Sequence, residues 1–276
     1  MNRRELISAI ATGIAITAGA PVLSACGATK PKAKDGGRME EIAYGDDPSQ
    51  FGRLYRPDSE DPLGTVVVIH GGFWKSAYDL SLGDPLAIDL ASRGWTAWNL
   101  EYRRVGDGGG WPRTFDDIAA GIDMLADIDG LELDAVVTLG HSAGGQLAVW
   151  AAGRRTAAVP VTAAISQAGV LDLDAGVRDG LGGGAVESFL GGSTAEFPDR
   201  YAFADPTRQI PLDVPVWCVH GIDDGAVPPS QSRNYVARAR AQGAEARLIE
   251  VTGDHFALID TESSAWAKTV DIFEVL

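Results

Sequence analysis

Hydrophobic residues follow two alternating patterns from residue 39 onward. Short continuous apolar runs such as 65–69 predict strands buried on both faces of a sheet. Stretches such as 116–128 repeat apolar residues at helical spacing. We expect strands at 39–45, 50–57, 65–69, 96–102, 135–139, 162–167, 214–219 and 246–251, and helices at 84–93, 116–128, 143–152, 230–242 and 264–275. This alternation is typical of an α/β protein with a mostly parallel central sheet and helices on both faces.

The segment 171–212 interrupts this alternation. It is rich in Gly, Asp and Pro, and it contains one short apolar helix candidate at about 186–190. A long excursion from a strand end is usually a cap or a binding loop. We therefore expect a single domain over 39–276, with 171–212 as a small cap or variable segment.

The first 26 residues differ from the rest of the chain. Paired arginines precede an uncharged stretch of small and apolar residues, as in bacterial export signals. The stretch ends in Leu23–Cys26, which resembles a lipobox, so we expect cleavage before Cys26 and a lipid anchor on its thiol. Residues 27–38 would then tether the domain to the extracytoplasmic face of the cell membrane. An uncleaved membrane anchor is the alternative, and the arginines leave the twin-arginine and general export routes both open.

Composition and charge exclude several classes of function. The formal net charge is −15 and the body of the chain has no cluster of Lys or Arg, so nucleic acid is not an expected partner. A zinc site needs Cys and His at short spacing, and the two cysteines, Cys26 and Cys218, are far apart. Cys218 lies in an apolar run and is expected to be a buried strand thiol. We expect no metal site.

A candidate nucleophile lies in Gly140-His-Ser-Ala-Gly144, which matches G-x-S-x-G. The motif is persuasive because of its context, since a predicted strand precedes it and a predicted helix follows it. The turn between them is strained and tight, which explains the glycines. Ser142 would stand at the positive end of the helix, where negative charge is stabilised.

A serine hydroxyl needs a base to take its proton. Of the four histidines, His70 begins a His-Gly-Gly sequence, His141 adjoins Ser142, and His220 ends a strand. His255 remains, on the loop after the last strand, and we expect it to be the base.

A carboxylate is expected to orient that histidine and to stabilise its charged form. Asp223 and Asp224 both follow the strand at 214–219, so the residues alone leave two candidates. The other carboxylate would then be a turn former.

The motifs HGGFW, EYRRVGDGGGWP, GHSAGGQLA, FLGG…RY…DP, HGIDDGAVP and GDHFALID occur in this order. From about residue 40 to the C-terminus, the chain resembles a carboxylesterase group of the α/β-hydrolase superfamily. This group includes kynurenine formamidase-like and feruloyl/acetyl-esterase-like (BD-FAE) enzymes. The resemblance implies an α/β-hydrolase fold, no cofactor and a triad of Ser142, Asp224 and His255, with H-G-x-x-D-x-x-V-P selecting Asp224.

The resemblance also implies an oxyanion hole. One half would come from the amides of Gly72 and Phe73, after the first buried strand, and the other from Ala143. Trp74 and the segment 171–212 would border the acyl or leaving-group pocket, although a plain core role for Trp74 remains open.

These features predict a serine hydrolase that cleaves a small-molecule ester through an acyl-enzyme. Hydrolysis of an amide or formamide by the same triad is the alternative. A surface binding module that has lost catalysis is a third. The lipoprotein signal favours the ester, because the formamidase substrate is an intracellular metabolite.

Overall fold

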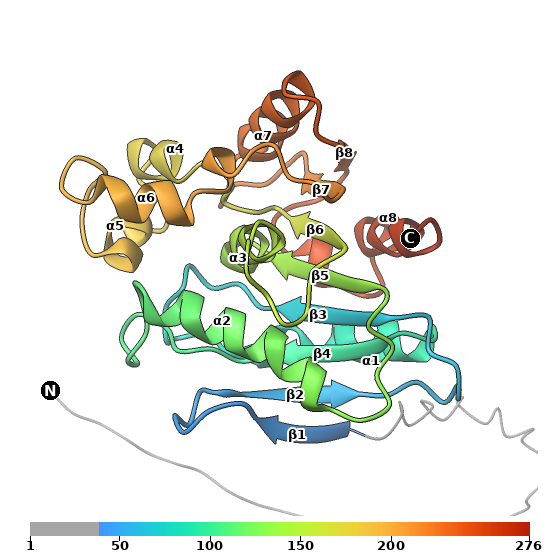
Figure 1. Cartoon of the computed structure of the whole chain (residues 1–276). Helices are drawn as coiled ribbons and strands as arrows, with labels where there is room; N and C mark the ends of the chain where they lie inside the picture. Colours follow the sequence, from blue (N-terminus) through green and yellow to red (C-terminus); the bar gives the residue numbers. More distant parts are fainter. Residues whose placement is uncertain (1–38) are drawn as a thin grey trace, which may run out of the picture. The chain divides into compact units, whose positions relative to one another are not determined.

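The computed structural model describes residues 39–276. The predicted export signal, Cys26 and the predicted tether lie outside the described residues. The described part forms an eight-stranded sheet of order β1-β2-β4-β3-β5-β6-β7-β8 (Figure 1). The strands are β1 (Met39–Ala43), β2 (Phe51–Tyr55), β3 (Thr65–Ile69), β4 (Thr96–Leu100), β5 (Val136–His141), β6 (Ala163–Gln167), β7 (Val216–Gly221) and β8 (Ala246–Val251). The helices are α1 (Asp84–Ser92), α2 (Arg113–Asp123), α3 (Ala143–Ala152), α4 (Leu173–Arg178), α5 (Ala185–Leu190), α6 (Pro198–Ala204), α7 (Ser230–Ala241) and α8 (Ser264–Phe273).

The sheet is mostly parallel, as predicted. Only the pairings of β1 with β2 and of β2 with β4 are antiparallel, and every pairing from β4 to β8 across the sheet is parallel. After β4 the chain crosses back over β3 to form β5, so the direction of winding reverses there. In open α/β sheets, ligands bind beyond the carboxyl ends of the strands at such a reversal. The two glycine-rich motifs, after β3 and after β5, therefore reach the same edge.

Helices cover both faces of the sheet, and the strands alternate between two cores. On β3, Val67 and Ile69 pack in the cluster that contains residues of α2 and α3. Their neighbours Val66 and Val68 pack in the cluster that contains residues of α1 and α8. Because β3 is buried on both faces, its sequence is a continuous hydrophobic run. Within residues 39–276, none of the helices combines the length and the apolar character needed to span a membrane.

The segment 171–212 is more ordered than the sequence indicated. It contains α4, α5 and α6 and ends in a short 3₁₀ turn, whereas only α5 was predicted. Helices of six or seven residues have fewer than two turns, too short for a periodic signal. Their stability comes from packing, because Leu173, Phe189 and Tyr201 are buried in the same core cluster as α2 and α3. The backbone N–H of Asp172 also donates to Gln231 Oε1 on α7 at 2.7 Å.

Close packing at the start of α3 generates a first prediction. A Cβ added at Gly144 would overlap the carbonyl oxygen of Ile69, which is backbone and cannot rotate away. We expect Gly144→Ala to lower the free energy of unfolding by at least about 2 kcal/mol, measured by urea denaturation. Gly225→Ala is the control, because its added Cβ would meet nothing within 4 Å. Equal stability of the two variants would contradict this account of the turn.

Candidate active site

Ser142 occupies the turn between β5 and α3. Its backbone has φ 56° and ψ −118°, a positive φ that costs a non-glycine residue about 1–3 kcal/mol. The surrounding structure holds this strain, because the Ser142 N–H donates to the carbonyl of Gln167 on β6 at 2.8 Å. The residue is 2% exposed. The strand, turn and helix predicted around the motif are thus present, with the serine at the amino-terminal end of α3.

His255 and Asp224 form a hydrogen-bonded pair on two neighbouring loops. His255 Nδ1 lies 2.6 Å from Asp224 Oδ2. The loops after β7 and β8 pack tightly, since a Cβ added at Gly221 would overlap the carbonyl oxygen of Gly253. Of the two carboxylates that the residues left open, Asp224 makes the contact, while Asp223 is exposed.

Asp224 is surrounded by donors. Its Oδ1 accepts the backbone N–H groups of Ala226 and Val227, both at 2.8 Å. Its Oδ2 also lies 3.3 Å from His220 Nε2. Burial by itself would raise the pKa of Asp224, but the hydrogen bonds from His220, His255 and Val227 outweigh it and hold that pKa well below its usual range. The carboxylate is therefore ionised at neutral pH and can orient the imidazole of His255.

His220 and His141 support this pair. His220 Nε2 lies 2.9 Å from the carbonyl oxygen of Val227, and its Nδ1 lies 2.7 Å from Ser232 Oγ. His141 Nε2 lies 2.8 Å from the carbonyl oxygen of His255. Burial lowers the pKa of His141 to about 3, so this imidazole is neutral and can hold the loop of His255 without adding charge. When His255 was selected among the four histidines of the sequence, His141 and His220 were assigned no role.

The His-Gly-Gly loop after β3 lies directly against the serine. A Cβ added at Gly71 would come within 3.1 Å of Ser142 Cβ. The next residues, Gly72 and Phe73, have positive φ values of 110° and 51°. Within residues 39–276, the backbone N–H groups of Gly72, Phe73 and Ala143 donate to no protein acceptor. The three amides proposed from the sequence are therefore free to bind an external oxygen.

The carboxylate of Glu101 holds the His-Gly-Gly loop through His70, and the sequence alone predicted no individual role for this residue. Its carboxylate accepts from the backbone N–H groups of Leu80 and Tyr102, at 3.0 and 2.8 Å, and contacts His70 Nε2 at 3.0 Å. Arg104 Nη1 contacts the same carboxylate at 3.3 Å. Burial would raise the pKa of Glu101, but the hydrogen bond with His70 and these other contacts lower it overall. A charged residue directly after a buried strand was the signal that could have identified it.

Trp74 lies in the core, the alternative that the sequence left open. Its side chain has no exposed surface and stacks on Phe189, with ring centroids 4.5 Å apart. Trp74 Nε1 donates to Gln146 Oε1 at 3.1 Å, and Gln146 Nε2 donates to the carbonyl of Ala204 at 2.8 Å. Gln146, on the first turns of α3, thus connects the loop of Phe73 to α6.

The described residues hold no cluster of His, Cys, Asp or Glu that could bind a metal ion. The arrangement that they do hold is a strained serine, a histidine paired with a buried carboxylate, and free amides beside the serine. The BD-FAE family model matches residues 53–238. The chain belongs to the BD-FAE family.

The alignments with curated relatives cover most of this chain but only about half of each relative. Esterase LipC of Mycobacterium tuberculosis (strain ATCC 25618 / H37Rv) is 27% identical over 222 residues, which is 72% of this chain and 54% of that protein. The isoprenylcysteine alpha-carbonyl methylesterase ICME of Arabidopsis thaliana is 26% identical over 239 residues, or 77% and 55% of the two chains. The chain therefore spans about half the length of the curated relatives that it matches.

Solved structures share the fold. A truncated carbohydrate esterase from gut microbiota matches with a TM-score of 0.74 and 20% identity, over 89% of this chain and 99% of that one. Esterase B from Lactobacillus rhamnosis (HN001) matches with a TM-score of 0.75 and 19% identity, over 87% and 85%. At such identities the likeness concerns the fold, and the α/β-hydrolase fold expected from the sequence is confirmed.

The lowered pKa of Asp224 predicts a pH-dependent contribution to stability. Because the pKa is lower in the folded than in the unfolded state, the ionised carboxylate stabilises the fold above the unfolded value, and this contribution is lost as the pH falls toward the folded value. We expect the difference in unfolding free energy between wild type and Asp224→Asn to be constant above about pH 5.5 and to shrink steadily below about pH 4.

Urea titrations across this pH range measure that difference. Asp223→Asn is the matched control, since it changes the exposed neighbouring carboxylate. If the difference in unfolding free energy between wild type and Asp224→Asn is constant down to about pH 2.5, the proposed stabilisation is ruled out.

Proposed function

We propose that this protein is a serine carboxylesterase that cleaves small esters through an acyl-enzyme formed on Ser142. The observation that carries the proposal is the contact of 2.6 Å between His255 Nδ1 and Asp224 Oδ2. A buried, ionised carboxylate at that nitrogen leaves Nε2 as the atom that accepts a proton. The names of the relatives support the same chemistry, because LipC and ICME are both named as esterases.

In the proposed reaction, His255 Nε2 takes the proton of Ser142 as its Oγ attacks the ester carbonyl carbon. The negative charge then lies on the former carbonyl oxygen, where the amides of Gly72, Phe73 and Ala143 can donate to it. Each such donor typically lowers the barrier by about 3 kcal/mol. Collapse of the intermediate expels the alkoxide, which receives the proton from His255. Water, deprotonated by the same histidine, attacks the acyl carbon of the acyl-enzyme. The bond from that carbon to Ser142 Oγ then breaks, His255 returns the proton to Oγ, and the acid leaves.

Burial of the site supports a small acyl group. Ser142 and His255 are 2% and 5% exposed, which leaves little open surface beside the reacting atoms. The buried, stacked rings of Trp74 and Phe189 pack next to the end of the His-Gly-Gly loop. A short acyl chain would need the least rearrangement of these packed side chains.

We expect Ser142→Ala to lower kcat for 4-nitrophenyl acetate by a factor of about 10³ or more, because the nucleophile is removed while the fold is kept. The rate of nitrophenol release measures it, and a fluorophosphonate probe should label wild type but not the variant. Ser188→Ala, an exposed serine on α5, is the control and should keep the wild-type rate.

Equal hydrolysis by wild type and Ser142→Ala would overturn the proposal. N-formylkynurenine is assayed in parallel, because the same triad could cleave a formamide. Faster turnover of that compound than of aryl and sugar acetates would replace the ester by the amide as the substrate class.

We further propose that Cys26 anchors the protein to the extracytoplasmic face of the cell membrane. The lipobox-like segment Leu23–Cys26 supports this, and it lies outside the described residues. Two or three acyl chains on one cysteine hold a protein firmly, at about 0.8 kcal/mol for each buried methylene. The paired arginines at the start of the signal fit export by the twin-arginine route.

In the bacterial host, we expect wild type to lose its leader and to incorporate labelled fatty acid. Cys26→Ser should keep the leader and incorporate none, because the thiol that carries the diacylglycerol is absent. Mass spectrometry and lipid labelling of the membrane fraction measure both. The anchor proposal fails if wild type itself remains unprocessed and unlabelled, which would favour an uncleaved membrane anchor.

A further inference from the structure

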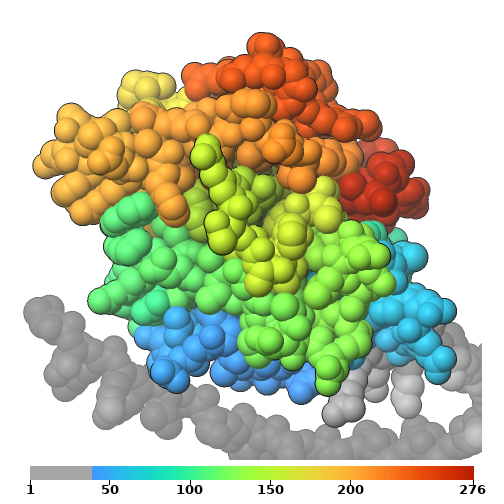
Figure 2. Space-filling view, viewed as in Figure 1, coloured from blue at the N-terminus to red at the C-terminus, as the bar shows by residue number. Residues whose placement is uncertain are grey.

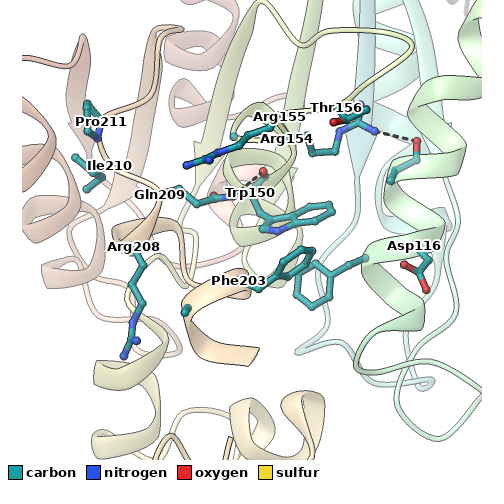
Figure 3. A pocket seen from close by; sticks show the side chains of 14 residues that line it. Asp116, Trp150, Arg154, Arg155, Thr156, Phe203, Arg208, Gln209, Ile210 and Pro211 are labelled. Atoms are coloured by element: carbon teal, nitrogen blue, oxygen red, sulfur yellow. Dashed lines mark hydrogen bonds between the residues drawn. The ribbon is translucent and has the colours of Figure 1, made fainter. Parts of the chain in front are cut away.

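A cavity that the candidate active site does not use opens at the carboxyl-terminal end of α3, the end opposite Ser142. It has a volume of about 660 Å³ and opens between α2, the carboxyl-terminal end of α3, α6 and the residues that follow α6 (Figure 3). This volume is within the range of about 300–1,000 Å³ that is usual for ligand pockets. Trp150 lines the cavity eight residues after Ser142, which corresponds to about 12 Å along the helix. Figure 2 shows this face, where the orange segment borders the yellow-green residues that follow α3.

Three aromatic rings form one wall of the cavity. Phe203 on α6 packs edge-on against Phe115 of α2, with centroids 5.5 Å apart, and lies 5.4 Å from Trp150. Phe115 and Trp150 are buried, but Phe203 is 46% exposed at the cavity. An exposed aromatic side chain on a rigid aromatic base offers a flat apolar surface at little entropic cost, which is a common feature of binding sites.

Polar groups without partners surround this wall. Arg155 and Thr156 follow α3, and Asp116 lies on α2. Within residues 39–276, no hydrogen bond or ion pair engages these three side chains. The other two arginines at the cavity are engaged, since Arg154 contacts Asp123 at 3.2 Å and Arg208 contacts Asp174 at 2.6 Å. Among the described residues, the cavity therefore has one free cation, one free carboxylate and one free hydroxyl, together with Gln209 Oε1, a buried acceptor without a partner.

The arrangement of these groups restricts the chemistry of the ligand. In Figure 3 the rings of Trp150 and Phe203 lie between Arg155 and Asp116. Arg155 can only donate hydrogen bonds and an ionised Asp116 can only accept them, so a ligand that binds both must itself accept and donate. An aromatic carboxylate has no donor for Asp116, and an amino acid carries both of its charges on one carbon. The net charge of −15 also disfavours an anion.

A neutral sugar ring meets these requirements. Its hydroxyl groups both donate and accept, they stand around the whole rim of the ring, and its C–H face can pack on Phe203. We propose that this cavity is a carbohydrate-binding site that takes a neutral pyranose unit of an oligosaccharide. The site is separate from Ser142 and does not depend on the ester hydrolysis proposed above.

Titration of the full-length protein with xylotriose and cellotriose tests the proposal, by saturation-transfer NMR and calorimetry. We expect saturable binding of at least one trisaccharide, with Kd in the millimolar range. Phe203→Ala should weaken it about fivefold or more by removing the flat surface. Arg155→Gln, which removes the cation and keeps a donor, should weaken it less. Ser142→Ala should bind as wild type does.

Phe256→Ala is the matched control, because Phe256 is 59% exposed and lies beside His255. It should leave trisaccharide binding unchanged if the sugar occupies the cavity. Binding lost in Phe256→Ala but kept in Phe203→Ala would assign the sugar to the active site and overturn the proposal. No saturable binding up to about 20 mM, or tight binding of benzoate in place of sugar at Phe203, would overturn it as well.

Discussion

The contact between the start of α3 and the end of β3 is the constraint on which the rest of the site depends. At Gly144 the helix backbone approaches the carbonyl oxygen of Ile69 so closely that no Cβ fits between them. This approach forces the chain through a positive φ at Ser142. It also brings the His-Gly-Gly loop against the serine, because Ile69 pairs with Gly140 in the parallel register of β3 and β5. One close packing contact thus assembles two loops that are 70 residues apart in the chain.

Buried polar groups maintain this geometry around the side chains of the candidate site. Glu101 holds the loop of Gly72, and His141 and His220 hold His255 and Asp224. Each of these groups is buried, and each is hydrogen-bonded, which avoids the cost of an unpaired polar atom in the interior. Asp224 is ionised and His141 is neutral. The imidazole of His255 therefore contacts an anion, and His141 adds no positive charge beside it.

The segment 171–212 contacts both the candidate active site and the cavity at Phe203. Its helices pack in the same core as α2 and α3, and Gln146 joins the loop of Trp74 to the carbonyl of Ala204 at the end of α6. Phe203, the exposed ring of the cavity, is the residue before Ala204. The segment thus packs against Trp74, at the end of the His-Gly-Gly loop, and forms one side of the cavity at Phe203.

The sequence by itself determined the alternation of strands and helices and the mostly parallel sheet, and it selected Ser142 and His255 as the candidate nucleophile and base. Local patterns suffice for these features, because periodicity, glycine-bounded turns and the scarcity of histidines are properties of the chain. The residues alone left two adjacent aspartates open and the resemblance implied Asp224, which the tertiary structure places against His255. The tertiary structure alone decided the burial of Trp74 and the contacts of Glu101, His141 and His220. It also revealed α4, α6 and the cavity at Phe203. These features depend on contacts between residues distant in the chain, and side-chain burial and hydrogen bonding across elements leave no periodic signal in a single sequence.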